Sequence, residues 1–249
     1  MPGDFLTFLL VGFFAQLVDG ALGMAFGVIS TTALLSLGLP PAFASATVHT
    51  AEIFTTGASA ASHILHGNVN RRLVIELAAA GAVGAIIGAY ILSNIDGQAM
   101  RPFVAAYLLV LGISILLRAL RRPPGSDAPP AFAAPLGIVG GFLDAIGGGG
   151  WGATVTATLL GSGHAARMVI GSVNSAEFFV TLAAATTFFI ELKVVPLQGL
   201  VGLTVGGVLA APLGAYLARY VPARMLMAAV GLLVMGLAGI QIAKSLNVF

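Results

Sequence analysis

Long apolar runs separated by short polar stretches dominate the pattern of the chain. Because about 20 apolar residues are needed to cross the hydrocarbon layer of a membrane, each run of that length predicts a transmembrane helix. Six such runs lie at residues 42–66, 73–93, 102–118, 167–191, 197–218 and 225–243. The pattern therefore predicts an all-α protein that crosses a membrane several times.

Two further apolar regions, residues 5–38 and 132–162, are too long for a single crossing. Each is interrupted in its middle by an aspartate followed by glycines, and residues 147–150 of the second region are four consecutive glycines. Each glycine in a helix costs about 1 kcal/mol relative to alanine, so we expect the helix to break there. Each region is predicted to be a pair of short helices, either a hairpin that returns to its starting side or two short crossings.

The second half of the chain repeats the first with an offset of 125 residues. The matching positions include Asp19/Asp144, Gly23/Gly148, Gly27/Gly152, Thr31/Thr156, Glu52/Glu177 and Thr56/Thr181. A stretch rich in proline and arginine joins the two copies and is typical of an aqueous linker. The sequence predicts an N-terminal repeat at 1–120, a cytoplasmic linker at 121–131 and a C-terminal repeat at 132–249.

The basic residues indicate how the repeats are oriented. If each interrupted region is a hairpin or two full crossings, eight arginines lie on one side of the membrane and three basic residues on the other; a single kinked span divides them seven to four. Basic residues concentrate in cytoplasmic loops, which favours the first arrangement. We therefore predict two inverted-topology repeats, each a broken helical hairpin plus three transmembrane helices, with both termini outside the cytoplasm.

Composition narrows the classes of function. Of the 249 residues, 58% are hydrophobic and 8% are charged, against about 25% charged in an ordinary soluble domain. A water-soluble enzyme is excluded, and the lipid bilayer is the expected surrounding. The chain has no cysteine and a net charge of +2, so we expect no thiolate metal site, no other metal or cofactor, and no nucleic-acid partner.

Four acids lie at membrane depth: Asp19, Glu52, Asp144 and Glu177. An ionised acid at the bilayer centre costs about 2.5 to 3.5 kcal/mol, so these groups must face a wet cavity, find hydrogen-bond partners or be protonated. Because they occupy matching positions in the two repeats, we expect them to meet near the axis that relates the repeats. Transporters of this design hold their substrate there.

Glu52 belongs to a polar row on an otherwise apolar helix. Ser45, His49, Glu52, Thr56 and Ser59 are three or four residues apart and share one face. Such a row either holds helices together or lines a cavity, and the ionisable groups in both copies favour a cavity. The candidates for proton coupling are Asp19, His49, Glu52, Asp144 and Glu177.

The glycine-rich breaks predict an anion site that needs no buried Arg or Lys. An opened backbone exposes N–H groups at the start of the next half-helix, where the helix dipole is positive. The candidate substrate-binding residues are Gly23, Gly27, Thr47, Thr50, Gly148, Gly149, Gly150, Trp151, Ser172, Asn174 and Ser175. The alternative is that the glycines serve close packing while Asp19 and Asp144 cap the half-helices. Trp151 either gates the second break or simply packs.

The second break, GGGGWG at 147–152, and the segments ATVHTAE at 46–52 and GSVNSAE at 171–177 resemble the TauE/SafE family of sulfite and organosulfonate exporters. The resemblance covers nearly the whole chain. The first break departs from the family's motif, because Leu22 and Met24 interrupt its glycines. The resemblance implies a multi-pass carrier of small sulfur oxyanions or organic anions in the bacterial inner membrane.

The sequence therefore predicts a non-enzymatic, proton-linked secondary transporter of a small anion such as sulfite or a sulfonate, with both termini periplasmic. An anion between the breaks would repel ionised Glu52 and Glu177 and favour proton uptake. A passive anion channel is the nearest alternative. An intramembrane hydrolase that uses Ser45 and His49 is a more distant one. Glycines at 81, 84 and 88 suit helix contacts or the face of a homodimer.

Overall fold

The computed structural model describes residues 5–22, 24–120, 132–161, 166–193, 197–217 and 223–245. These residues form helices and no strands, which confirms the predicted all-α class. The first half contains α1 (Phe5–Leu22), α2 (Phe26–Ser36), α3 (Pro41–Leu65), α4 (Arg71–Asn94) and α5 (Gly97–Ala119). The second half contains α6 (Ala133–Gly147), the π-helical turn η1 (Gly152–Thr156), α7 (Ala157–Gly161), α8 (Ala166–Leu192), α9 (Leu197–Leu217) and α10 (Ala223–Ser245).

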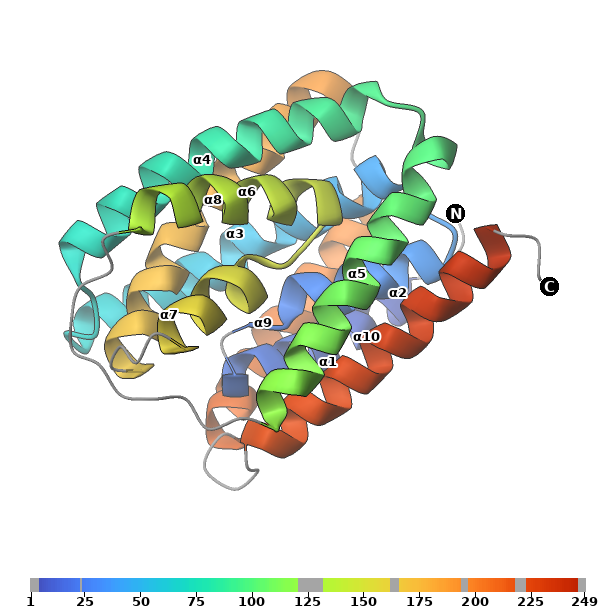
Figure 1. Ribbon diagram of the computed structural model, residues 1–249. Helices are drawn as coiled ribbons and strands as arrows, with labels where there is room; N and C mark the ends of the chain where they lie inside the picture. Colours follow the sequence, from blue (N-terminus) through green and yellow to red (C-terminus); the bar gives the residue numbers. More distant parts are fainter. Residues whose placement is uncertain are drawn as a thin grey trace.

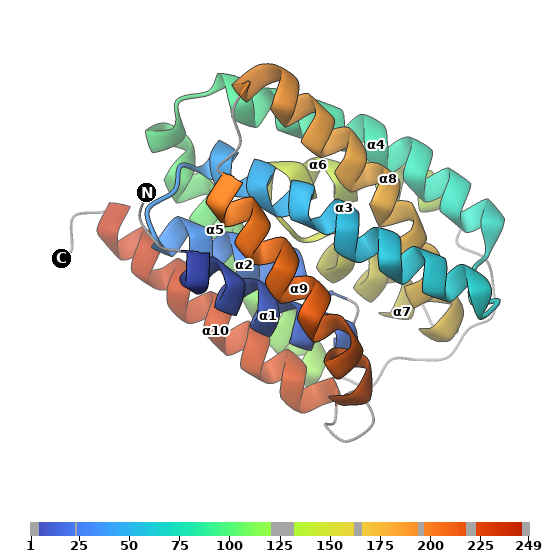
Figure 2. The same cartoon turned by 180° about the vertical axis from the view of Figure 1, so that it is seen from behind.

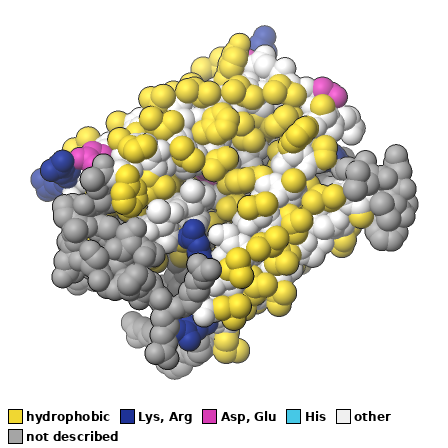
Figure 3. All heavy atoms as spheres, viewed as in Figure 1, with side chains coloured by type: hydrophobic (Ala, Val, Ile, Leu, Met, Phe, Trp, Pro, Cys, Tyr) yellow, Lys and Arg dark blue, Asp and Glu magenta, His cyan; other side chains and the backbone are white. Residues whose placement is uncertain are grey.

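The six predicted crossings correspond to the helices α3, α4, α5, α8, α9 and α10. Four stretches within the described residues are long and apolar enough to span a membrane: Arg71–Asn94, Gly97–Ala119, Met168–Leu192 and Met227–Lys244. Large hydrophobic side chains are exposed along these helices. Hydrophobic side chains are spread over much of the face seen in Figure 3, and only a few charged side chains are visible there. The protein is therefore a multi-pass membrane protein.

Both long apolar regions are broken, as predicted, but the breaks lie a few residues beyond the aspartates. Asp19 and Asp144 remain in the last turns of α1 and α6. In the second break, the backbone leaves the helix at a run of glycines. The φ angles of residues Gly148, Gly149 and Gly150 are 71°, 148° and 140°, which side chains with a Cβ rarely adopt.

The long helices lie along a common diagonal direction, with the two broken pairs between them (Figures 1 and 2). Helix α1 of the first half packs along α9 of the second, and α6 of the second half packs along α4 of the first. The pairs α3–α8 and α5–α10 also join the two halves. The beginning of α1 and the end of α10 lie at the same end of the molecule in both views. The two halves are therefore interlocked.

A matching pair of glycines lies at two of these contacts. A Cβ added at Gly12 would lie 2.3 Å from the carbonyl oxygen of Leu203, and one added at Gly137 would lie 3.0 Å from that of Leu77. Gly12 and Gly137 are matching positions of the repeat. Small residues let the helix backbones touch, which is the usual source of helix association in a membrane. The orientation of the repeats across the membrane stays a prediction, and the linker 121–131 lies outside the described residues.

The glycines of α4 pack inside the chain. Gly81 lies against Trp151 and Val180, and Gly84 and Gly88 lie against α6. These contacts cover the glycine face of α4 that the sequence suggests as a homodimer contact. A homodimer stays a prediction, and these glycines serve internal packing instead.

We expect Gly84→Ala and Gly206→Ala to lower stability by about 1 to 3 kcal/mol each, the usual cost of inserting a methyl group into a tight contact. Their added Cβ atoms would lie 2.1 Å from the carbonyl oxygens of Ile138 and Leu9, so the helices would have to separate. Thermal unfolding of the purified protein in detergent measures the change.

Gly236→Ala is the matched control, because a Cβ there meets nothing within 4 Å. It should be neutral or stabilising by up to about 1 kcal/mol, the gain in helix propensity. Equal thermal midpoints for all three variants would contradict the packing described.

Candidate functional site

The two breaks touch each other. A Cβ added at Gly149 would lie 2.3 Å from the carbonyl carbon of Gly27, and one added at Gly27 would lie 2.8 Å from the Cα of Gly149. The hydroxyl of Thr31, on α2, donates a hydrogen bond to the carbonyl oxygen of Gly148. The irregular backbone of each half is thus covered by that of the other, as a membrane interior requires.

Each aspartate spans its own break and caps the helix that follows. Oδ1 of Asp19 accepts hydrogen bonds from the N–H groups of Ala25 at 2.6 Å and Phe26 at 3.1 Å. Oδ1 of Asp144 accepts one from the N–H of Trp151 at 2.8 Å. Phe26 and Trp151 are matching positions, so the same cap occurs in both halves. Such caps are worth about 1 kcal/mol and satisfy amides that the helix start leaves without partners.

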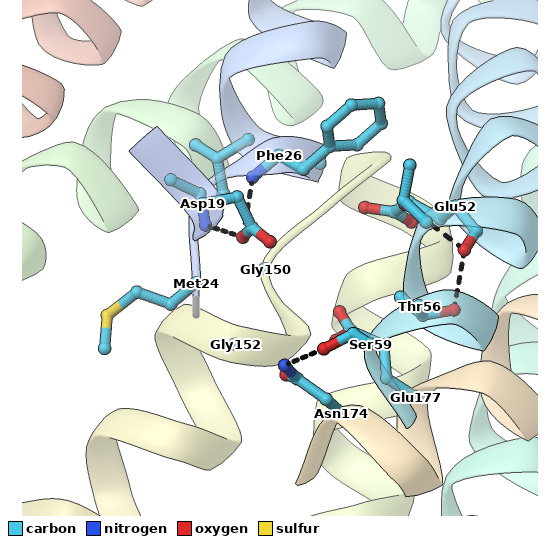
Figure 4. Close-up of a pocket in the computed structure, with 14 residues that line it drawn as sticks. Asp19, Met24, Phe26, Glu52, Thr56, Ser59, Gly150, Gly152, Asn174 and Glu177 are labelled. Atoms are coloured by element: carbon cyan, nitrogen blue, oxygen red, sulfur yellow. Dashed lines mark hydrogen bonds between the residues drawn. The ribbon is translucent and has the colours of Figure 1, made fainter. Parts of the chain in front are cut away.

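A small cavity lies beside the touching breaks, and Figure 4 shows its lining. Its volume is about 20 Å³, which is room for one water molecule. The first break supplies residues 24–28 to the lining, whereas the second supplies Gly150 and Gly152. The remaining lining residues are Asp19, Glu52, Thr55, Thr56, Ser59, Asn174 and Glu177. The cavity is therefore built mainly around the start of α2.

Three of the four membrane acids line this cavity, and the fourth lies close behind it. Glu52 is 4% exposed, and its Oε2 has no hydrogen-bond partner among the described residues. Its Oε1 lies 2.8 Å from where a Cβ of Gly27 would be. Asp144 is near enough to interact electrostatically with both glutamates. The acids therefore lie close together, while their place on an axis that relates the repeats stays a prediction. No Lys or Arg belongs to the described lining.

The side chain of Asp144 contacts that of His49. Nε2 of His49 lies 3.0 Å from Oδ2 of Asp144, and both side chains are almost fully buried. The other ring nitrogen, Nδ1, lies 2.9 Å from the backbone oxygen of Ser45 and therefore donates to it. The two side chains thus form a buried hydrogen-bonded pair. This pair fixes α3 to the second broken pair of helices.

The same geometry opposes the hydrolase alternative. Oγ of Ser45 lies 3.2 Å from Nδ1 of His49, but the hydroxyl donates to the carbonyl oxygen of Ala145 at 2.7 Å. Nδ1 already donates its own proton to a backbone oxygen, so it is not placed to accept one from the hydroxyl. Ser45 and His49 are fully buried, and neither lines the cavity. Their arrangement serves helix packing.

The two halves differ at this point. The residue that matches His49 is Asn174, whose Nδ2 donates to Oγ of Ser59 at 2.9 Å and which lines the cavity. The side chain that hydrogen-bonds to Asp19 is Gln16, from the same helix. The second break is thus held by a hydrogen-bonded pair between helices, while the first break supplies more of the cavity lining.

Comparison with known proteins agrees with this architecture. A sequence model described as "Sulfite exporter TauE/SafE" matches residues 8–242. The chain belongs to the TauE/SafE family.

Two curated relatives of this TauE/SafE protein are named as transporters. The "Probable membrane transporter protein YtnM" of Bacillus subtilis (strain 168) is 41% identical over 223 residues, which cover 86% of this chain and 74% of the relative. The "Probable membrane transporter protein ORF9" of a Sinorhizobium species is 29% identical over 194 residues, covering 75% of this chain and 67% of the relative. No solved structure matches the chain.

In this TauE/SafE protein the structure brings together some of the predicted site residues. Gly27, Gly150, Asn174, Asp19, Glu52 and Glu177 line the cavity, and Gly148 and Gly149 form the contact between the breaks. Asp144 and His49 form the buried pair behind it. Gly23 lies outside the described residues.

The other predicted binding residues lie away from the cavity. The hydroxyls of Thr47, Thr50 and Ser175 donate to carbonyl oxygens one turn earlier in their own helices. Ser172 accepts a hydrogen bond from the N–H of Asn70. Trp151 is fully buried, and its Nε1 donates to the carbonyl oxygen of Val173. Ser and Thr hydroxyls in a helix commonly bond back to a carbonyl oxygen of that helix, so helical spacing alone does not reveal which of them face a cavity.

Sequence reasoning missed Thr55, Met24 and Val28 as lining residues. Thr55 lies three residues after Glu52 and was detectable from helical spacing. The sequence does not single out Met24 and Val28, because the pattern of apolar residues at a break is the same whether the side chains face a cavity or a neighbouring helix.

We expect Asp144→Asn to destabilise the protein by about 1 to 3 kcal/mol, because it disturbs the buried hydrogen bond to His49. Asp19→Asn should cost less than about 1 kcal/mol, because asparagine is as good a helix cap as aspartate. Thermal unfolding in detergent compares the two variants.

The double variant His49→Asn/Asp144→Asn is the control for this pair. It should cost less than the sum of the single changes, because each single change leaves the other partner alone. Equal losses for Asp19→Asn and Asp144→Asn, or strictly additive losses in the double variant, would contradict the role given to the pair.

Proposed function

We propose that this protein is a secondary transporter that carries a small sulfur oxyanion or organic anion, such as sulfite or a sulfonate, together with a proton. Membership of the TauE/SafE family and the relatives' names support a membrane transporter. The observation that carries the anion assignment is that the first turn of α2 lines the cavity.

The start of α2 supplies what an anion needs. The first four N–H groups of a helix lack partners within the helix, and the helix dipole is positive there. Asp19 accepts from the amides of Ala25 and Phe26. Gly27 and Val28 follow in the same first turn and line the cavity. A Cβ at position 27 would crowd the carboxylate of Glu52. Glycine at this position therefore leaves room between Glu52 and the start of α2.

Proton coupling follows from the charge of the same cavity. An anion at the amides of α2 would lie beside Glu52 and Glu177, and like charges a few ångströms apart repel strongly where water is scarce. Binding is favourable if a proton enters with the anion and neutralises one of these acids. Glu52 is the first candidate, because its buried Oε2 lacks a partner among the described residues.

The size of the cavity supports a carrier rather than an open channel. Room for one water molecule is too little for sulfite, which has four heavy atoms, so the helices must move for substrate to enter. The contact between the breaks joins the two halves, and rocking of one repeat against the other would open the cavity to alternate sides. In this proposal the protein lies in the bacterial inner membrane, with both termini in the periplasm.

Transport into proteoliposomes tests the coupling, with sulfite and with methanesulfonate, which stays ionised and does not cross lipid as a neutral acid. One pH unit is worth about 1.4 kcal/mol per proton, so the native protein should accumulate substrate up to about tenfold on the alkaline side. Glu52→Gln should abolish this response to the gradient, because the variant carries no proton at that position.

Glu76→Gln is the matched control, because Glu76 pairs with Arg72 at the surface, 2.7 Å away, and does not line the cavity. It should retain the response to the gradient. Normal proton-driven accumulation in Glu52→Gln would remove this residue from the mechanism. Uptake that neither saturates nor shows counterflow would favour the channel.

A further inference from the structure

A second, larger hollow lies on the outside of the helices α3, α4 and α8, which pack against one another (Figure 2). This groove has a volume of about 770 Å³. Its lining residues are Gly57, Ala61, Ile64, Gly67, Val69, Arg71, Val74, Ile75, Ser175, Phe178 and Phe179. All but Arg71 and Ser175 are glycine or hydrophobic. The groove is therefore an apolar trough that contains one cationic side chain.

The groove begins at the α3–α4 turn and extends toward the middle of the helices. Ile64 lies at the end of α3, and Arg71 is the first residue of α4. Gly57 lies seven residues earlier on α3, about 10 Å away at the rise of an α-helix, and contacts the ring of Phe178. The guanidinium thus lies at the outer end of the trough, and the aromatic side chains lie toward its inner end.

The two adjacent arginines at this turn differ in their surroundings. Nε of Arg72 hydrogen-bonds to Oε1 of Glu76 at 2.7 Å, so its charge is already balanced by a carboxylate. Arg71 lines the groove, and no acidic side chain belongs to the groove's lining. The positive charge of Arg71 is the one available to a ligand in the groove.

We propose that this groove binds an anionic phospholipid, with the headgroup phosphate on Arg71 and an acyl chain between α3 and α8. A cation at the outer end and an apolar trough leading inward match the two parts of such a lipid. Arginine binds phosphate through two parallel N–H donors, and basic pockets between transmembrane helices are a recurrent place for anionic headgroups. The proposal is independent of the transported substrate.

A lipid fits this groove better than a free anion or a second copy of the chain. A free phosphate would contact Arg71 alone and would leave the apolar walls uncovered. A second copy of the chain would have to place an acidic side chain beside Arg71 and a hydrophobic segment in the trough. An anionic lipid carries both the acidic group and the hydrophobic part on one molecule. The surrounding bilayer also presents this lipid to the groove at high local concentration.

The groove and the cavity share their walls. On α8, Ser175 and Phe178 face the groove, while Asn174 and Glu177 line the cavity. On α3, Gly57 faces the groove, while Thr56 lines the cavity. A bound acyl chain would therefore contact both α3 and α8, and we expect this burial of apolar surface to raise the stability of the folded protein.

Native mass spectrometry and thermal unfolding of the detergent-purified chain, with phosphatidylglycerol or phosphatidylcholine added, test the proposal. Phosphatidylglycerol should bind more tightly and raise the thermal midpoint more. Arg71→Gln should weaken its binding about fivefold, the effect of one basic residue near an anionic headgroup. Arg72→Gln is the matched control and should change binding much less, because Arg72 does not line the groove.

A second variant fills the trough without touching the charge. Ala61→Trp should displace the acyl chain and remove the lipid's stabilising effect, whereas Ala58→Trp, at an exposed position that does not line the groove, should not. Equal binding of both lipids, or equal losses in Arg71→Gln and Arg72→Gln, would overturn the proposal. So would equal stabilisation by inorganic phosphate, or a groove variant that converts a dimer into monomers.

Discussion

The structure depends on a hydrogen bond that reaches across a gap in a helix. Where α1 and α6 end, main-chain N–H groups would face a medium that offers no water, and each orphaned group would cost several kcal/mol. Asp19 and Asp144 remove most of that cost by accepting from the first amides of the next helix. Without such caps, two irregular stretches could not lie in direct contact deep in the protein.

The caps also decide where an anion can be held. Asp19 accepts hydrogen bonds from the first amides of α2, and its carboxylate lies beside the amides that follow. The carboxylate charge repels an anion where those amides would attract one. In the function proposed above, a cavity lined by these acids accepts an anion when a proton enters with it. The buried pair of His49 and Asp144 links α3 to the end of α6 next to the second break. The proposal therefore places the solute at the first break.

Much of this arrangement could be predicted from the sequence, because its causes are local or symmetric. Apolar length predicts the long helices, the glycine run predicts the second break, and the matching of Glu52 with Glu177 predicts that the acids meet. The position of Trp151 could not be predicted, because an aromatic residue at a break has the same local pattern whether it gates a cavity or packs against Gly81. The partner of Asp144 lies 95 residues away on another helix, and only the packing of α3 against α6 identifies it.

The interlocking of the halves affects how the chain can assemble. Helix α1 finds its backbone contact on α9, so Gly12 has no partner until Leu203 has been synthesised. Until then, its small-residue face must be covered by lipid or by an insertion factor, and the first half alone is an incomplete bundle. A chain of half this length would lack these partner helices, and a second copy of itself is one source that could supply them.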